Sequence, residues 1–217
     1  MRNPGNRLVE GLAAHRCPGC LLLLPDCLCA LIPSVETRTR VLVVLHHFET
    51  RKPSNTGRLA LRCLPNSGAV IRGAPDQSQA APDWSEHGDP VLLFPHPDAR
   101  PLAELCGGLR PVTLIVPDAT WRQAQRMRRR VAGLIDLPCA FVTREAPSAY
   151  QLRRTPDPRR LSTMEAIAES LGLLEGGRGP AVRELLLGIF RVMVDRSLRS
   201  RSPQRAARET TGPQLRS

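Results

Sequence analysis

Short apolar runs alternate with amphipathic stretches along this chain of 217 residues. Runs rich in Val, Leu and Ile predict buried strands at residues 41–45, 91–94, 112–116 and 139–142. Apolar residues at helical spacing predict helices at residues 56–64, 98–106, 119–134, 163–174 and 181–195. Strands that alternate with helices indicate an α/β fold, with a mainly parallel sheet flanked by helices on both faces.

The predicted strands and helices occupy one domain, residues 38–195. A cysteine-rich knuckle at residues 15–32 precedes this domain, and residues 1–14 form a flexible N-terminus. Residues 72–90 are rich in proline, glycine and polar residues, which predicts a loop region. From residue 196 to 217 the chain is rich in arginine and lacks apolar periodicity, so we expect a basic disordered tail.

Polar residues follow each predicted strand. His46, His47 and Glu49 follow the first strand, and His96 follows the second. Asp118 follows the third strand, and Thr143 with Arg144 follows the fourth. The carboxyl ends of parallel strands meet at one edge, where α/β folds bind ligands. Strands must end in polar residues in any fold, but loops at strand ends carry function more often than chance predicts. We therefore expect a functional site at this edge.

The strand end with the most varied functional groups is the segment Asp118-Ala119-Thr120-Trp121, which joins a predicted buried strand to a basic helix. An acid, a hydroxyl and an indole meet there. On the helix, one face carries basic residues and the opposite face carries apolar ones. The basic residues are Arg122, Arg126, Arg129 and Arg130, and the apolar ones are Ala124, Met127, Val131 and Leu134. Like charges on adjacent turns repel one another, so we favour RNA or DNA contact over a merely solvated face.

The overall charge points the same way. Lys+Arg number 31 against 20 Asp+Glu, which gives a formal net charge of +11. Lys52 is the only lysine, and a GC-rich genome explains that bias without any functional cause. The excess of positive charge still indicates nucleic acid as the leading partner. Aromatic residues make up 3%, so at most one or two bases would be stacked, with Trp121 or Tyr150 as candidates.

Four of the seven cysteines are closely spaced. Cys17, Cys20, Cys27 and Cys29 form two pairs that predict a tetrahedral zinc site, although free thiols are the alternative. The odd cysteine count argues against a disulfide framework. The remaining thiols, Cys63, Cys106 and Cys139, lie in apolar stretches and are expected in the core. No apolar stretch approaches the roughly 20 residues that span a bilayer, and no secretory signal is recognisable, so the cytoplasm is the expected location.

Two predicted helices begin with polar residues that suit either capping or ligand binding. Ser162 and Glu165 have the spacing of a capping box, and Asn55 with Thr56 begins an earlier helix. Arginines precede the first of these starts, at Arg153, Arg154, Arg159 and Arg160. A helix N-terminus beside arginines can hold a carboxylate or phosphate, although capping alone also explains the pattern. No GxxxxGK[ST] or strand-linked GxGxxG motif occurs, which disfavours ordinary nucleotide hydrolysis and Rossmann-type cofactor binding.

These segments resemble the DTW-domain family, the tRNA-uridine aminocarboxypropyltransferases. The DxTW motif is matched by Asp118, Thr120 and Trp121. The resemblance covers about residues 15–195 and rests on the cysteine knuckle, LHHFETRKPSNTGRLA, VLLFPHPDA, VTLIVPDATWRQAQRM and YQLRRTPDPRRLSTMEAIA, in that order. One departure is His47, because the family pattern HPxE led by His46 has proline there.

The resemblance implies a SPOUT-like α/β domain with a C-terminal trefoil knot that binds S-adenosylmethionine. The implied reaction transfers the 3-amino-3-carboxypropyl group to N3 of a tRNA uridine, giving acp3U and methylthioadenosine. Asp118, Thr120 and Trp121 would be catalytic, with Asp118 as general base or as a ligand of the base edge. The expected donor-binding residues are Arg153, Ser162, Thr163, Glu165, Asn55 and Thr56. The arginines after the motif would hold tRNA phosphates, and we expect a monomer.

Two other functions stay open at this stage. A SPOUT-like RNA methyltransferase would use the same donor and release S-adenosylhomocysteine. A zinc-containing RNA-binding protein would catalyse nothing. The acid at Asp118 disfavours the second, because a surface that only binds phosphates gains nothing from a carboxylate.

Overall fold

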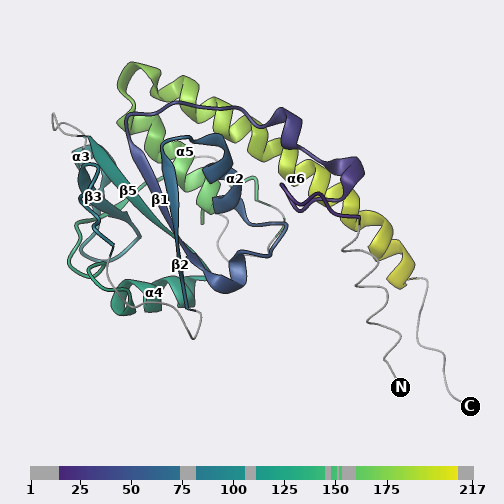
Figure 1. Cartoon of the computed structure of the whole chain (residues 1–217), viewed down its shortest axis with the longest axis horizontal. Helices are drawn as coiled ribbons and strands as arrows, with labels where there is room; N and C mark the ends of the chain where they lie inside the picture. Colours follow the sequence, from purple (N-terminus) through teal and green to yellow (C-terminus); the bar gives the residue numbers. More distant parts are fainter. Residues whose placement is uncertain are drawn as a thin grey trace, which may run out of the picture.

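The computed structural model describes residues 15–73, 82–105, 111–144, 148–150, 152 and 160–209, with side chains described as far as residue 200. Within these residues the chain forms a six-stranded sheet with helices on both faces (Figure 1). The α/β class predicted from the apolar pattern is therefore confirmed.

The sheet has the strand order β2-β1-β5-β3-β6-β4, and every neighbouring pair is parallel. The central strands β1 and β5 are the longest and pair from Arg40 opposite Thr113 to Leu45 opposite Asp118. The strands are β1 (Arg40–His46), β2 (Ser67–Arg72), β3 (Asp89–Leu93), β4 (Arg100–Pro101), β5 (Val112–Asp118) and β6 (Cys139–Phe141). A parallel sheet needs a crossover between strands, and helices form part of the crossovers from β1 to β2, from β4 to β5 and from β5 to β6.

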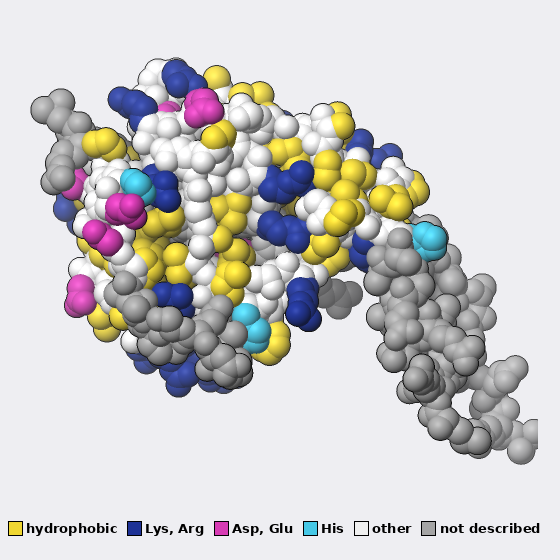
Figure 2. Space-filling view, viewed as in Figure 1, with side chains coloured by type: hydrophobic (Ala, Val, Ile, Leu, Met, Phe, Trp, Pro, Cys, Tyr) yellow, Lys and Arg dark blue, Asp and Glu magenta, His cyan; other side chains and the backbone are white. Residues whose placement is uncertain are grey.

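Five α-helices and four short 3-10 helices are described. The α-helices are α2 (Thr56–Cys63), α3 (Leu102–Leu105), α4 (Trp121–Arg130), α5 (Thr163–Leu174) and α6 (Gly179–Glu209). The 3-10 helices are η1 (Leu24–Asp26), η2 (Cys29–Leu31), η3 (His47–Glu49) and η4 (Gly176–Arg178). In Figure 1, α5 and the long α6 lie on one side of the sheet and α4 lies at the lower edge. Figure 2 shows Lys and Arg side chains along that lower edge.

Both faces of the sheet are buried, and the side chains of the central strands alternate between two cores. Val41, Val43 and Leu45 of β1 point to a core that they share with α2, α5 and α6. Leu42 and Val44 point to the opposite core, which they share with α4. Because successive strand residues face opposite sides, a strand covered on both faces is apolar at every position. The continuous apolar run at residues 41–45 has this cause.

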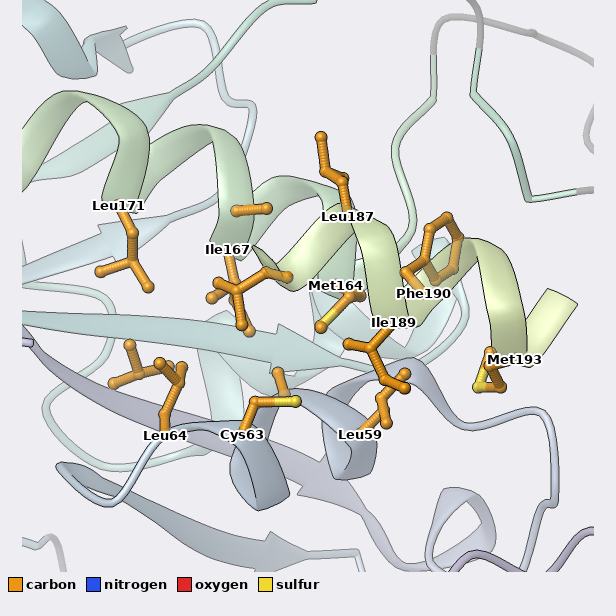
Figure 3. Close-up of a cluster of buried hydrophobic side chains, with 14 of the residues drawn as sticks. Leu59, Cys63, Leu64, Met164, Ile167, Leu171, Leu187, Ile189, Phe190 and Met193 are labelled. Atoms are coloured by element: carbon orange, nitrogen blue, oxygen red, sulfur yellow. The ribbon is translucent and has the colours of Figure 1, made fainter. Parts of the chain in front are cut away.

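The larger core lies between α2, α5 and α6 (Figure 3). Leu59, Cys63 and Leu64 face Met164, Ile167 and Leu171, and α6 closes the cluster. The α6 side chains in Figure 3 are Leu187, Ile189, Phe190 and Met193. Burial raises the pKa of the Cys63 thiol to about 12, so this cysteine is a neutral core residue. The core positions predicted for Cys63 and Cys139 are confirmed, whereas Cys106 lies outside the described residues.

Several boundaries differ from the sequence predictions. The strand β2 was not predicted, and β4 occupies two residues of the segment predicted as a helix at residues 98–106. The helix α4 ends at Arg130 instead of residue 134, because Val131 has an extended backbone.

The largest difference is at the C-terminus. The expected disordered tail from residue 196 is instead helical as far as Glu209, as the last part of α6. Two of its side chains contact the cysteine knuckle: Arg196 donates to the carbonyl oxygen of Cys27, and Ser200 donates to Asp26. These contacts give the basic segment a folded surface to pack against, which its composition alone does not reveal.

Within the described ranges, no helix has the length and apolar character needed to cross a membrane. The trefoil knot stays a prediction, because residues 145–147, 151 and 153–159, which lie between β6 and α5 in the chain, fall outside the described residues.

Candidate functional site

The candidate site lies at the carboxyl edge of the sheet. Since all strand pairs are parallel, the ends of β1, β3, β5 and β6 meet at this edge. The N-termini of α2 and α5 are joined to the end of β5 by contacts of Asp118, and α4 begins directly after it. The edge predicted to be functional from the polar residues at strand ends is therefore formed.

Asp118 is buried at this edge, with 5% of its surface exposed. The side-chain amide of Asn55 donates to its Oδ2 at 2.5 Å, and the hydroxyl of Thr163 donates to its Oδ1 at 2.7 Å. A buried carboxylate needs such donors, because the loss of water would otherwise disfavour its charge. Asp118 therefore joins the end of β5 to the starts of α2 and α5.

The start of α2 is built around this carboxylate. Asn55 caps the helix, since its Oδ1 accepts from the backbone N–H of Arg58 at 2.6 Å. A Cβ atom at Gly57 would lie 2.5 Å from Asp118 Oδ2, so only glycine leaves room for the carboxylate. Thr56 accepts from the backbone N–H of Met164 at 3.4 Å, which ties α2 to α5 a second time.

The start of α5 has the predicted capping box. Ser162 Oγ accepts from the N–H of Glu165, and Glu165 Oε2 accepts from the N–H of Ser162 at 2.8 Å. The Glu165 carboxylate is completely buried and accepts from three further groups. These donors are the Ser148 hydroxyl at 2.7 Å, the Ala149 N–H at 2.9 Å and Arg144 Nη1 at 3.1 Å. Both oxygens of Glu165 are thus bound to the protein itself.

A pocket of about 590 Å³ opens at the ends of β3 and β6, beside the starts of α4 and α5. Most of its lining residues are apolar, and polar groups come from α4, from the segment after β6 and from the start of α5. The lining residues are Leu93, Phe94, Pro95, Ala119, Trp121, Ala124, Gln125, Ala140, Phe141, Val142, Thr143, Arg160, Leu161, Ser162, Thr163 and Ala166. This volume lies within the range of about 300–1,000 Å³ that is common for small-molecule sites.

Trp121 forms one wall of the pocket and is 39% exposed. Its ring centroid lies 6.0 Å from that of Phe94, and the two rings are tilted by 43°, a separation at which aromatic pairs attract. The guanidinium of Arg160 lies over the Trp121 ring, with Cζ 4.9 Å from the ring centroid. The pocket therefore has an aromatic wall with a cation over it.

Of the residues selected from the sequence, Trp121, Ser162 and Thr163 line this pocket. Asp118, Asn55, Thr56 and Glu165 support it from the adjoining helix starts and are not part of its wall. Thr120 caps α4, accepting from the N–H of Gln123 while its own hydroxyl donates to Gln123 Oε1 at 2.7 Å. Arg153 lies outside the described residues.

The next polar group along the edge follows β1. His46 stacks on His47, with ring centroids 4.8 Å apart, and burial lowers the pKa of His46. Glu49 is fully buried and pairs with Lys52 at 2.6 Å. Neither His46 nor Glu49 lines the pocket. Tyr150, a stacking candidate from the sequence, packs its ring against Phe190 and donates its hydroxyl to the Ser54 carbonyl.

The helix α4 has the two faces that the sequence predicts. Ala124 and Met127 are buried against the sheet. The opposite face exposes Arg122, Arg126, Arg129 and Arg130. None of these four forms an ion pair with an acid of the described part of the chain. The face therefore keeps its positive charge beside the pocket, at the lower edge in Figure 2.

The cysteine knuckle brings four thiols together, with the sulfurs of Cys17, Cys20, Cys27 and Cys29 all within 4.8 Å of one another. The sulfurs of Cys17 and Cys29 are 3.5 Å apart, and those of Cys20 and Cys27 are 3.9 Å apart. Sulfurs that bind one zinc ion at about 2.3 Å in a tetrahedron lie roughly 3.8 Å apart. The knuckle can therefore hold a metal ion with little rearrangement.

The four thiols influence one another's ionisation. The backbone N–H of Cys20, and then the side chain of Cys27, lower the pKa of Cys17 to about 6. The N–H of Cys29 acts to lower the pKa of Cys27, but the side chains of Cys17 and Cys29 with burial raise it to about 12. Arg62 also donates to the sulfur of Cys29 at 3.2 Å. A cation at the centre would relieve this competition between thiolates.

The knuckle packs against the domain that holds the pocket. Leu22 and Leu28 are buried in the larger core, and Arg58 of α2 donates to the carbonyl oxygen of Gly19 at 2.9 Å. The same Arg58 is the residue whose N–H is capped by Asn55. The knuckle, α2 and Asp118 are thus joined by consecutive hydrogen bonds.

Sequence reasoning missed Phe94 as part of the site, and it named Arg160 only as one of four arginines that could help a helix start to hold a carboxylate or phosphate. The signal for Phe94 was its position at the end of a predicted strand. The contact of Arg160 with Trp121 joins residues far apart in the chain, which no local pattern reveals.

Comparison with known proteins finds a matching family and relatives that cover most of this chain. The family model described as DTW domain matches residues 14–198. A protein of Drosophila melanogaster named tRNA-uridine aminocarboxypropyltransferase 2 is 26% identical over 80% of this chain and 71% of its own length. A Macaca fascicularis protein of the same name is 27% identical over 79% of this chain and 59% of its own length.

A plant relative matches over a larger share of its length. The Arabidopsis thaliana protein named tRNA-uridine aminocarboxypropyltransferase A is 26% identical over 84% of this chain and 81% of its own length. The chain thus spans between 59% and 81% of these three relatives. No solved structure matches the chain.

The bond between Asn55 and Asp118 predicts a measurable coupling. In urea unfolding of the Asn55→Ala, Asp118→Ala and double variants, we expect a coupling energy of about 1.5–3 kcal/mol, the range for hydrogen bonds to charged groups. The matched control is Ser170→Ala, which lies in α5 about two turns beyond Thr163. The losses of unfolding free energy caused by Ser170→Ala and by Asp118→Ala should add within about 0.5 kcal/mol. If the losses of unfolding free energy caused by Asn55→Ala and Asp118→Ala are simply additive, the two side chains do not stabilise the protein through their hydrogen bond.

Proposed function

This chain belongs to the DTW domain family, and we propose that it transfers the 3-amino-3-carboxypropyl group of S-adenosylmethionine to N3 of a uridine in tRNA. The products are the modified uridine, acp3U, and methylthioadenosine. The names of the relatives support this reaction, and the pocket beside an arginine-rich helix face supports it independently. The single observation that carries most weight is this pairing of a small-molecule pocket with a cationic surface at one sheet edge.

The pocket suits the donor in size and character. Its apolar wall, built from the ends of β3 and β6, can receive an adenosine group, and Phe94 and Trp121 offer aromatic faces. Thr143, Ser162 and Thr163 offer hydroxyls at the other end. An apolar site with a few placed polar groups is the usual form of a small-molecule site.

The chemistry requires orientation and the removal of one proton. The N3–Cγ bond forms while the bond between Cγ and sulfur breaks, and its electron pair goes to sulfur. The sulfonium is already a good leaving group, so holding Cγ against N3 supplies most of the catalysis. The N3 proton must leave to a base.

We assign proton removal to Thr163 and Asp118 acting together. The Thr163 hydroxyl lines the pocket and donates to Asp118, which lies behind it. Thr163 can accept the N3 proton as its own proton passes to the Asp118 carboxylate. This relay lets a buried carboxylate act as general base without touching the uridine.

The exposed arginines of α4 are proposed to bind tRNA phosphates. They begin one residue after Trp121, so a uridine that enters the pocket would bring its flanking phosphates to this face. Arginine suits phosphate because its fork of N–H donors matches two phosphate oxygens. We also propose that the metal of the knuckle is zinc, for which four thiolates are a usual ligand set.

The reaction has a direct test. Incubation of tRNA with S-adenosylmethionine labelled in the aminobutyrate carbons should place the label in a uridine nucleoside and release methylthioadenosine. The variant Asp118→Asn should turn over about 100-fold more slowly or worse, since it cannot accept the proton, while donor binding persists. A methylated base with S-adenosylhomocysteine would replace this proposal with methyl transfer, and release of neither product would exclude both.

The RNA face predicts salt-dependent binding. The double variant Arg126→Gln/Arg130→Gln should lower the slope of log affinity for tRNA against log salt concentration by roughly 1.4 to 1.8, if each residue neutralises one phosphate. The control Arg191→Gln/Arg199→Gln removes the same charge from exposed positions of α6. Its slope of log affinity against log salt concentration should stay close to that of the wild type. Equal slopes for wild type and the α4 variant would mean that this face is only solvated.

The knuckle predicts one bound zinc ion per chain. Metal analysis of protein purified without chelator should find that ion, and Cys17→Ser/Cys20→Ser should lose it because two soft ligands are gone. The melting temperature should fall as well, since Leu22 and Leu28 depend on the knuckle for their burial. Cys63→Ala/Cys139→Ala, which removes two core thiols, should keep the metal. Wild-type protein without stoichiometric zinc would refute the assignment.

A further inference from the structure

The pocket has one charged side chain in its described wall, and this is Arg160. The other polar groups of that wall are hydroxyls and the amide of Gln125. The proposed donor carries a carboxylate at the end of the group that is transferred. A carboxylate that leaves water for a mostly apolar pocket needs a charged partner or several N–H donors.

The start of α5 is the obvious source of N–H donors, but three of its amides already have partners. The N–H of Ser162 binds Glu165 Oε2, and the N–H of Glu165 binds Ser162 Oγ. The N–H of Met164 binds Thr56. The helix start therefore has few free donors for an anion, and it carries no charged donor of its own.

Arg160 is differently placed, because its position leaves its donors available. The guanidinium lies over the Trp121 ring, with Cζ 4.9 Å from the ring centroid, and its side chain forms no hydrogen bond or ion pair with the other described residues. A cation–π contact uses the charge of the guanidinium and leaves its N–H groups free to donate. Arg160, which is exposed, is therefore restrained by this contact and can still bind a carboxylate through two parallel hydrogen bonds.

We propose that Arg160 binds the α-carboxylate of S-adenosylmethionine, with Trp121 as the platform that positions it. This inference rests on the proposed function and adds the residue that recognises the transferred group. Binding at the far end of the 3-amino-3-carboxypropyl chain fixes that chain, so that Cγ is presented to the uridine. Arg160 is then a determinant of which sulfonium substituent moves.

Binding of two ligands can distinguish recognition of the carboxylate by Arg160 from a merely structural role of Arg160 in the pocket wall. S-Adenosylmethionine carries the carboxylate, whereas methylthioadenosine has the same adenosine and sulfur without the amino-acid part. Calorimetric titration of Arg160→Gln should show about 10- to 100-fold weaker binding of S-adenosylmethionine, as expected for loss of a hydrogen bond to a charged group. Binding of methylthioadenosine should change by less than about twofold, and Arg160→Lys should recover part of the lost affinity.

Two further arginine variants serve as comparisons. Arg128→Gln removes a charge from α4 at a position whose guanidinium lies 3.4 Å from His96, outside the pocket wall, and should bind both ligands as wild type does. Arg153→Gln tests the arginine that the sequence resemblance places among the donor-binding residues. Thermal melts of all variants verify that each is folded.

The possible outcomes are distinct. Equal weakening of both ligands by Arg160→Gln would mean that Arg160 only supports Trp121, and unchanged binding would mean that it does not reach the donor; either result overturns the inference. Selective loss of S-adenosylmethionine in Arg153→Gln alone would assign the carboxylate to Arg153 instead. Wild-type protein that binds neither ligand would refute the donor site of the proposed function itself.

Discussion

The buried carboxylate of Asp118 is the interaction on which the site depends. It ends the central strand β5 and accepts from Asn55 before α2 and from Thr163 at the start of α5. Three elements from distant parts of the chain are thereby fixed at one point. A charge with 5% exposure would be costly without these donors, so the strand end and both helix starts must be formed together.

A second buried carboxylate, that of Glu165, joins the start of α5 to the segment that follows β6. Glu165 caps α5 and accepts from Arg144, Ser148 and Ala149, which follow β6. Thr163, which is bound to Asp118, and Ser162, which is bound to Glu165, both line the pocket. These two polar residues of the wall are therefore held by buried carboxylates that are not themselves part of the wall. The proposed donor, with its positive sulfonium and negative carboxylate, would meet hydroxyls and one arginine there.

Much of this arrangement follows from the sequence, and the remainder has physical reasons for escaping it. The central strands were predictable because both their faces are buried and every residue is apolar. The strand β2 was not, since it is an edge strand that begins Ser67-Gly68-Ala69 and buries little. Asp118 was found from its motif, but its partner Asn55 lies 63 positions away. Local patterns identify caps such as Ser162 with Glu165, whereas contacts between distant helix starts depend on the packing of the whole domain.

The arrangement of charge also separates two kinds of binding. The arginines of α4 project from the face opposite to Ala124 and Met127, which pack on the sheet. Their positive charge is solvated and long in range, which suits a flexible polyanion that must be attracted and oriented. Arg160 instead lies over Trp121 in the pocket wall, where this contact restrains it and one carboxylate could accept two hydrogen bonds from it. Because Trp121 is both the first residue of α4 and the platform for Arg160, the surface for the polyanion and the pocket for the small molecule share one side chain. On the proposed function, RNA bound at α4 would therefore affect how the donor is held, through the position of a single indole ring.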